Sequence, residues 1–162
     1  MTRRTARHPL WSGLVLALAL GGLTVGGQPA VSWATTPPPP ATSSGLSKGQ
    51  KTLLKREWGI EVEFVRHSSA GYMLEFRYRV HDPELAAPIF ERGDKPLLTH
   101  QETGARLSVP SPGKTGPLRN SDPPLQGKSY WMFFANPGVY VKKGDKVDIE
   151  IGDFKVTGLV VQ

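Results

Sequence analysis

The chain of 162 residues contains no cysteine. This absence excludes a disulfide framework, a thiolate metal site, a cysteine nucleophile and a lipid-modified cysteine. A folded domain of this chain must therefore be held together by its hydrophobic core. Histidine is also scarce, and neither a Gly-x-Ser-x-Gly nucleophile motif nor a His-Glu-x-x-His zinc motif occurs. We therefore expect a protein that is not an enzyme and carries no cofactor.

The first 34 residues have the features of a secretory signal peptide. Arginines at positions 3, 4 and 7 precede an apolar run at residues 14–20, and Ser32 and Ala34 occupy the positions that a signal peptidase reads. The run is too short to span a bilayer. We expect export and cleavage, hence no stable membrane insertion: a periplasmic protein if the source is Gram-negative, and a secreted one otherwise. An uncleaved membrane anchor is the alternative.

The positive charge of the exported chain is modest. The formal net charge is +6, but residues 1–34 hold three arginines and no acid. The remaining chain has 17 basic and 14 acidic residues, a net charge of +3. This balance gives little support for nucleic-acid binding, and we expect no nucleic-acid partner.

The composition predicts one domain behind a linker. Residues 35–46 are rich in proline, serine and threonine and predict an extended linker. Residues 47–162 form a β-sandwich domain that is long enough for a self-supporting core. A short helix at residues 47–57, capped by Ser47, is expected at its start.

The strongest strand pattern in the sequence covers residues 71–80. Apolar and polar side chains alternate there, which is typical of a strand with one face on a core and one face towards water. The side chains expected on the core face are Tyr72, Leu74, Phe76, Tyr78 and Val80.

Residues 58–66 predict the preceding strand, and residues 69–71 the turn of a hairpin. A three-residue hairpin loop needs a left-handed last residue, which Gly71 supplies. The register that follows pairs residues whose numbers add to 140. The pairs include Phe64 with Phe76, Glu63 with Arg77, and Glu61 with Arg79. Each pair of opposite charges is expected to contribute from a few tenths to about 1 kcal/mol.

The rest of the domain reads as further short strands. The expected elements are a short helix after Asp82, a hairpin of residues 95–100 and 105–110, a long loop at 111–128, a central strand at 129–135, a turn at 136–138, and strands at 139–141, 147–151 and 154–161. About seven strands at this spacing predict an all-β fold, an immunoglobulin-like antiparallel β-sandwich with a short N-terminal helix.

Three segments carry a resemblance. They are residues 72–80 followed by Asp82-Pro83, residues 134–138, and residues 141–145 continuing through 151–154. Most of residues 58–162 is similar in this way to a group of uncharacterised exported bacterial β-sandwich proteins. The resemblance implies a protein of the bacterial cell envelope and implies no catalytic residue.

The long loop and the strand after it hold the candidate binding residues. Basic and aromatic side chains beside each other on a long loop are typical of a recognition surface. The candidates are Lys114, Arg119, Lys128, Tyr130 and Trp131. The leading hypothesis is a non-enzymatic binding or accessory module that contacts an envelope protein or another periplasmic partner. Burial of Trp131 in the core is the alternative to its role in contact.

Copper handling in the periplasm is the alternative function. The predicted register places Met73 opposite His67, and these side chains are two possible copper(I) ligands. His81 is expected at the far end of the same strand, about 30 Å away, so it cannot share the ion. Two ligands do not complete a site.

Overall fold

The computed structural model describes residues 44–162, apart from residue 92. The predicted signal peptide and most of the predicted linker lie outside the described residues. Ser44 and Leu46, at the end of that linker, are buried. The Ser44 carbonyl accepts a hydrogen bond from the Val160 N–H at 3.1 Å. The last three residues assigned to the linker therefore pack on the domain, because they continue its hydrogen bonding and its core.

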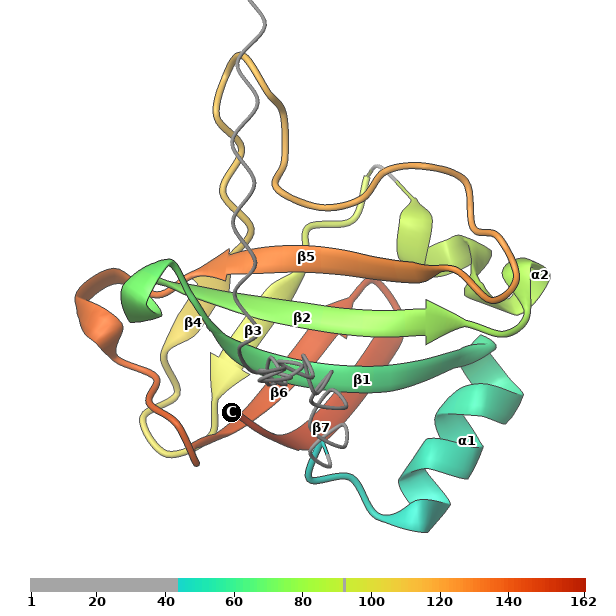
Figure 1. Cartoon of the computed structure of the whole chain (residues 1–162), viewed down its shortest axis with the longest axis horizontal. Coiled ribbons are helices and arrows are strands. Elements are labelled where there is room, and N and C mark those ends of the chain that lie inside the picture. Colours follow the sequence, from blue (N-terminus) through green and yellow to red (C-terminus); the bar gives the residue numbers. More distant parts are fainter. Residues whose placement is uncertain (1–43, 92) are drawn as a thin grey trace, which may run out of the picture. The chain divides into compact units, whose positions relative to one another are not determined.

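The described residues form seven strands in two antiparallel sheets, with few helices. One sheet has the order β1-β2-β5 and the other the order β4-β3-β6-β7 (Figure 1). The strands are β1 (Ile60–Ser68), β2 (Met73–Val80), β3 (Leu97–His100), β4 (Arg106–Ser108), β5 (Ser129–Ala135), β6 (Lys146–Ile151) and β7 (Phe154–Val160). The chain is β-rich, as its alternating segments predicted.

Side chains of both sheets share one hydrophobic core. Phe76 of β2 and Tyr130 of β5 are fully buried from one sheet, and Leu98 of β3 and Ile149 of β6 from the other. The side chains that point inward repeat every second residue along β3, β5 and β6, as in sheets with one face on a core. The core therefore covers the inner face of each sheet.

Two helices flank the sheets, and both begin as the sequence predicted. Helix α1 (Lys48–Trp58) has Ser47 as its N-cap, with a capping box between Ser47 and Gln50. Helix α2 (Pro83–Ala86) is capped by Asp82, whose side chain accepts from two backbone N–H groups. Three short 3-10 turns are η1 (Ser69–Gly71), η2 (Ala87–Phe90) and η3 (Pro137–Val139). None of the helices in the described part of the chain is both long and apolar enough to cross a membrane.

The hairpin of β1 and β2 forms, but its predicted register is correct only at the end away from the turn. Val62 pairs with Tyr78, as predicted, whereas Phe64 pairs with Arg77. A bulge between Val62 and Phe64 adds one residue to β1. Because side chains alternate along a strand, this extra residue turns Phe64 to the outer face and buries Val65 instead.

The bulge also changes the predicted partner of Glu63 on the outer face. Glu63 binds Arg79 at 2.9 Å instead of Arg77. Glu61 lies opposite Arg79 in the register, as predicted, but its side chain contacts His81, and the hydrogen bond from His81, 2.9 Å long, lowers the pKa of the Glu61 carboxyl. The buried Glu75 forms ion pairs with Arg66 and Arg77. Opposite charges still meet on this face, but in a different pairing.

Three further expectations are corrected. Tyr72 lies in the hairpin turn and is 60% exposed, so it does not belong to the core face. Strand β5 lies at an edge of its sheet, and β2 is the central strand. Residues 139–141 form no strand; they follow a turn in which Gly138 has φ 68° and ψ 9°, the conformation of the third residue of a type II turn.

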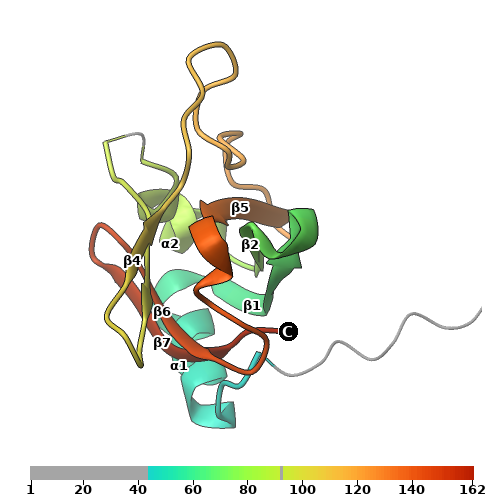
Figure 2. The same ribbon diagram turned by 90° about the vertical axis from the view of Figure 1, so that its left-hand side faces the viewer.

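The segment between β4 and β5, residues 109–128, has little regular structure. Part of it projects away from the sheets in both views (Figures 1 and 2). Short backbone hydrogen bonds hold the projection, among them Leu118 N–H to the Pro110 carbonyl at 2.9 Å. Part of the long loop predicted at residues 111–128 is therefore a projection with a narrow base, whereas Arg119 pairs with β5.

Candidate functional site

The two aromatic candidates lie on opposite sides of β5. Tyr130 is fully buried, and its hydroxyl donates to the Pro123 carbonyl at 2.8 Å and accepts from the Leu125 N–H at 2.9 Å. Trp131, the next residue, points to the outer face, where it is half-buried and its ring centre lies 5.1 Å from that of Phe133. Alternation along the strand therefore prevents the two rings from forming one surface.

The three basic candidates are also separated. Lys114 is exposed in the projecting segment. Lys128 forms an ion pair with Asp122 at 3.2 Å and lies over the Tyr130 ring. Arg119 is buried, with 8% of its surface exposed. The structure thus does not bring the five candidates together, and Arg119 stands apart because a buried arginine is rare.

Arg119 is held in place by backbone pairing with the free side of β5. It forms an isolated antiparallel bridge with Met132. On either side of the bridge, Asn120 N–H donates to the Trp131 carbonyl and Phe133 N–H donates to the Leu118 carbonyl, both at 2.9 Å. Residues paired across a ladder point to the same side. Arg119 therefore points to the core side of β5, as the buried Met132 does.

The guanidinium of Arg119 is only partly satisfied. Its Nη2 donates to the Glu91 carbonyl at 2.8 Å. Its Nη1 is buried without a hydrogen-bond partner, and no ion pair among the described residues includes Arg119. Arginine stays charged in proteins, and a buried charge without a counterion is costly. An anion beside Nη1 would remove this cost.

The Arg119 charge also acts inside the core. Burial raises the pKa of the Tyr78 hydroxyl, and the positive charge of Arg119 opposes that rise. Tyr78 stacks on Tyr130 with ring centres 6.0 Å apart. Because its pKa is raised, the Tyr78 hydroxyl stays uncharged at neutral pH and supplies no anion to Arg119.

Arg119 lines a pocket of about 420 Å³. The pocket, called here the Arg119 pocket, is lined by Asp94, Lys95, Pro96, Ser108, Val109, Ser111, Pro117 and Arg119. These residues come from the segment before β3, the end of β4 and the base of the projection. Its volume lies within the range of small-molecule sites, about 300–1,000 Å³.

The chemistry of the Arg119 pocket suits an anion. Arg119 and Lys95 bring two positive charges against the single carboxylate of Asp94. Ser108 and Ser111 add hydroxyl donors at the exposed side. Guanidinium, ammonium and hydroxyl groups are the usual partners of carboxylate and phosphate oxygens.

The two possible copper ligands predicted from the sequence, His67 and Met73, do not face each other. His67 pairs with Leu74, and Met73 pairs with Ser68. Neighbouring residues of a strand point to opposite faces, so His67 and Met73 are directed apart. His67 Nε2 lies 2.9 Å from the Val141 carbonyl and donates to it, because a carbonyl oxygen only accepts. The bulge in β1 is the cause of this difference from the predicted pairing.

Sequence reasoning selected Arg119 for its charge and missed the rest of the pocket. Lys95 and Ser108 are far from Arg119 in the sequence, and no local pattern joins them. The available signal was an arginine two residues after Pro117, on the long loop that precedes the apolar strand at residues 129–135. Comparisons with protein-family models, with curated proteins and with solved structures find no match to this chain.

Proposed function

We propose that this chain is an exported, non-enzymatic binding module of the cell envelope, and that the Arg119 pocket holds an anionic group of its partner. The observation that carries the proposal is the buried Arg119 Nη1, which has no partner among the described residues and belongs to a residue lining an open pocket. The shared chemistry of the ligand is a carboxylate or a phosphate. A carboxylate would come from an acidic side chain or a chain end, and a phosphate from a small headgroup.

The size of the pocket limits what enters it. About 420 Å³ accommodates one side chain or one small headgroup. A protein partner would insert a single anionic group and rest against the projecting segment, where Lys114 is exposed. This arrangement resembles other recognition sites in which a loop on a rigid β scaffold supplies the contacts.

We infer that the fold is an immunoglobulin-like sandwich. In a constant-type immunoglobulin domain, strands A, B, E and D form one sheet and C, F and G the other. With β1 to β7 taken as A to G, the sheet orders β1-β2-β5 and β4-β3-β6-β7 differ from this scheme only in β4. Strand β4 pairs with β3 instead of β5. The side of β5 that faces away from β2 is therefore free to pair with residues 118–120, which include Arg119.

The proposed location outside the cytoplasm rests on the N-terminal sequence pattern. Mass spectrometry of the protein recovered from its native envelope tests it: a chain beginning at Thr35 supports export with cleavage. An intact N-terminus on a membrane-bound chain would contradict cleavage.

The pocket is tested by NMR with sodium phosphate and sodium acetate as probes, at constant ionic strength set with chloride. We expect the side-chain ¹⁵N resonance of Arg119 to shift with a saturable dependence on one of the two anions. Lys95→Ala removes one exposed positive charge at the pocket and should weaken binding several-fold. Lys114→Ala removes the same charge in the projection, away from the pocket lining, and serves as the matched control.

The outcomes separate the pocket from general attraction of anions. Weaker binding in Lys95→Ala and unchanged binding in Lys114→Ala support the proposal. A shift that stays linear in anion concentration, or equal losses in both variants, overturns it. Arg119→Lys adds a second check, because it keeps the charge and removes the planar fork that binds two oxygens at once.

A further inference from the structure

A second polar site lies at the end of the other sheet. His100 is the last residue of β3, Glu102 lies in the turn to β4, and Asp145 lies in the turn before β6. Strands β3 and β6 are paired, with His100 opposite Val147. Both turns are therefore at the same end of the sheet. One ligand atom from each of the three residues lies within 4.8 Å of the others.

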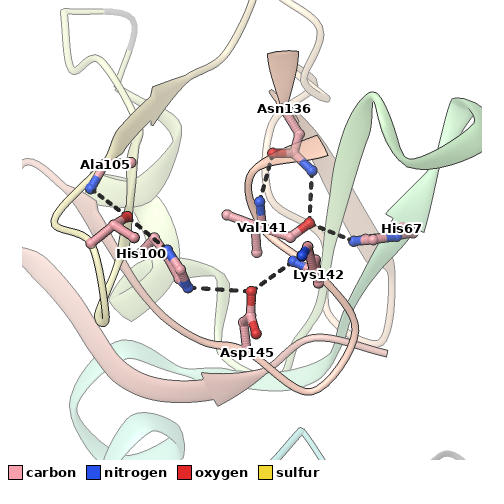
Figure 3. A network of polar contacts seen from close by, with 8 residues as sticks. His67, His100, Ala105, Asn136, Val141, Lys142 and Asp145 are labelled. Carbon is pink, nitrogen blue, oxygen red and sulfur yellow. Dashed lines mark hydrogen bonds and ion pairs between the residues drawn. The ribbon is translucent and has the colours of Figure 1, made fainter. Parts of the chain in front are cut away.

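The His100 side chain is almost completely buried, with 3% of its surface exposed. Its Nδ1 lies 2.8 Å from the Thr103 hydroxyl. Its Nε2 is buried and makes no hydrogen bond within the described part of the chain, although Asp145 Oδ2 lies only 3.3 Å away (Figure 3). A buried polar atom left in this way requires an explanation.

A metal ion between the two atoms explains this geometry. For bonds of about 2.0–2.1 Å to zinc, ligand atoms 3.3 Å apart subtend an angle of about 107° at the metal, close to the tetrahedral value. The Nε2 lone pair would then point about 36° away from the line to Asp145, as a consequence of these bond lengths. A direct hydrogen bond from Nε2 would be misaligned by the same amount.

The groups behind the two ligands hold them in place. The tautomer of His100 with a proton on Nδ1 donates to Thr103 Oγ1 and leaves the Nε2 lone pair for a metal. The Thr103 oxygen also accepts from the Ala105 N–H at 3.3 Å. The Asp145 carboxylate accepts from the Lys142 N–H at 2.7 Å. Partners of this kind orient metal ligands and are part of most metal sites.

We propose that His100, Glu102 and Asp145 bind a divalent transition metal of the zinc class. Imidazole nitrogen and carboxylate oxygen are both ligand types that zinc accepts, and the imidazole disfavours calcium and magnesium. The site adjoins a depression of about 340 Å³ from which water supplies the fourth ligand. The depression is also lined by Lys146, whose charge weakens the affinity for a cation.

The test is a titration of the metal-free protein with zinc chloride, in competition with a chromophoric chelator of micromolar affinity. We expect one zinc per chain. Glu102→Gln and Asp145→Asn should each weaken binding at least tenfold. Glu102 is exposed, so Glu102→Gln leaves the fold intact. Circular dichroism checks the fold of each variant.

The matched control is the second histidine–carboxylate pair of the domain. His81 Nε2 lies 2.9 Å from Glu61 Oε2 on the outer face. Among the described residues, no group of three possible metal ligands includes this pair. His81→Ala should bind zinc as the wild type does. Lys95→Ala should also bind zinc normally, which separates this site from the Arg119 pocket.

NMR measures metal binding at His100 directly, because a purely structural role of His100 would not make its Nε2 resonance depend on zinc. Zinc should shift the Nε2 resonance of His100 and leave that of His81 unchanged. The proposal is overturned by the absence of zinc binding at millimolar concentration, by equal affinity in Glu102→Gln and wild type, or by a zinc-induced shift confined to His67 or His81.

Discussion

Asn136 joins two turns at the same end of the domain. The residue is fully buried and follows β5 directly. Its side-chain amide donates to the Gly71 carbonyl at 2.9 Å. The amide also donates to the Val141 carbonyl at 2.9 Å, and its oxygen accepts from the Val141 N–H at 3.1 Å (Figure 3). All of these partners are backbone groups that are otherwise costly to bury. The side chain thus fixes the hairpin turn of β1 and β2 against the turn after β5.

Replacing this amide tests the role of the connection. Asn136→Ala removes the partner of the Gly71 carbonyl and of the Val141 N–H, whereas the Val141 carbonyl keeps its hydrogen bond from His67, so the free energy of unfolding should fall by about 1–3 kcal/mol. Urea denaturation measures this change in the free energy of unfolding. Asn120→Ala is the control, because Asn120 Oδ1 has no hydrogen-bond partner among the described residues. Equal losses in the two variants would show that the hydrogen bonds of Asn136 contribute nothing specific.

At the scale of elements, the bulge in β1 decides which charges meet on the outer face. Arg79 donates from Nε and Nη2 to the same oxygen of Glu63, at 3.0 and 2.9 Å. The serine hydroxyl of Ser129 on β5 donates to that oxygen at 2.8 Å. Arg77, the partner predicted for Glu63, binds Glu75 instead. The contact of Glu63 with β5 would be lost in the unbulged register.

A double-mutant cycle distinguishes the two registers. Glu63 and Arg79 should show a coupling free energy of about 0.2–1 kcal/mol, the usual range for an exposed ion pair. Glu63 and Arg77 should show a coupling near zero. The cycles use Glu63→Ala with each arginine replaced by alanine, followed by urea denaturation in low salt. A larger coupling with Arg77 would support the unbulged register and contradict the structure.

At the scale of the whole domain, the C-terminal residues connect the two sheets. Val161 follows β7 and forms a parallel bridge with Val65 of β1. The His67 N–H donates to the Gln162 carbonyl at 3.1 Å, and the Gln162 N–H donates to the Val65 carbonyl at 2.9 Å. Both valines are buried. The first and last strands thus close one side of the core.

Val161→Ala tests this closure. Removing two buried methyl groups should lower the free energy of unfolding by about 2 kcal/mol, through lost burial and a residual cavity. Val160→Ala is the matched control: Val160 is only half-buried, and we expect the smaller loss there. Thermal and urea denaturation both report the difference. A Val160→Ala variant that is less stable than Val161→Ala would contradict the role of Val161 in connecting the two sheets.

Local patterns predicted the elements of this fold well. The alternation in β2, the Ser47 cap of α1, the Asp82 cap of α2 and the β3–β4 hairpin follow from neighbouring residues, and the structure confirms each. The bulge was not predictable from the same pattern, because β1 has apolar residues at both Phe64 and Val65. Either residue fits a core, and packing against the second sheet decides between them.

The candidate sites were less predictable than the elements. Arg119 was recognised as a charge on a long loop, but its burial depends on pairing with Met132 of β5. His100 and Asp145 are 45 positions apart in the sequence and meet because β3 pairs with β6. No periodicity relates such residues, since their contact is a property of the sheet order.

By itself, the sequence determined that this is a β-rich domain without disulfides, because alternation, turn residues and composition act over a few neighbouring positions. Only the tertiary structure decided which charges are buried and which side chains meet. The unpaired Arg119 nitrogen and the His100–Asp145 contact both arise where distant segments pack together. Burial and long-range pairing are set by the free energy of the whole domain, which no single stretch of residues contains.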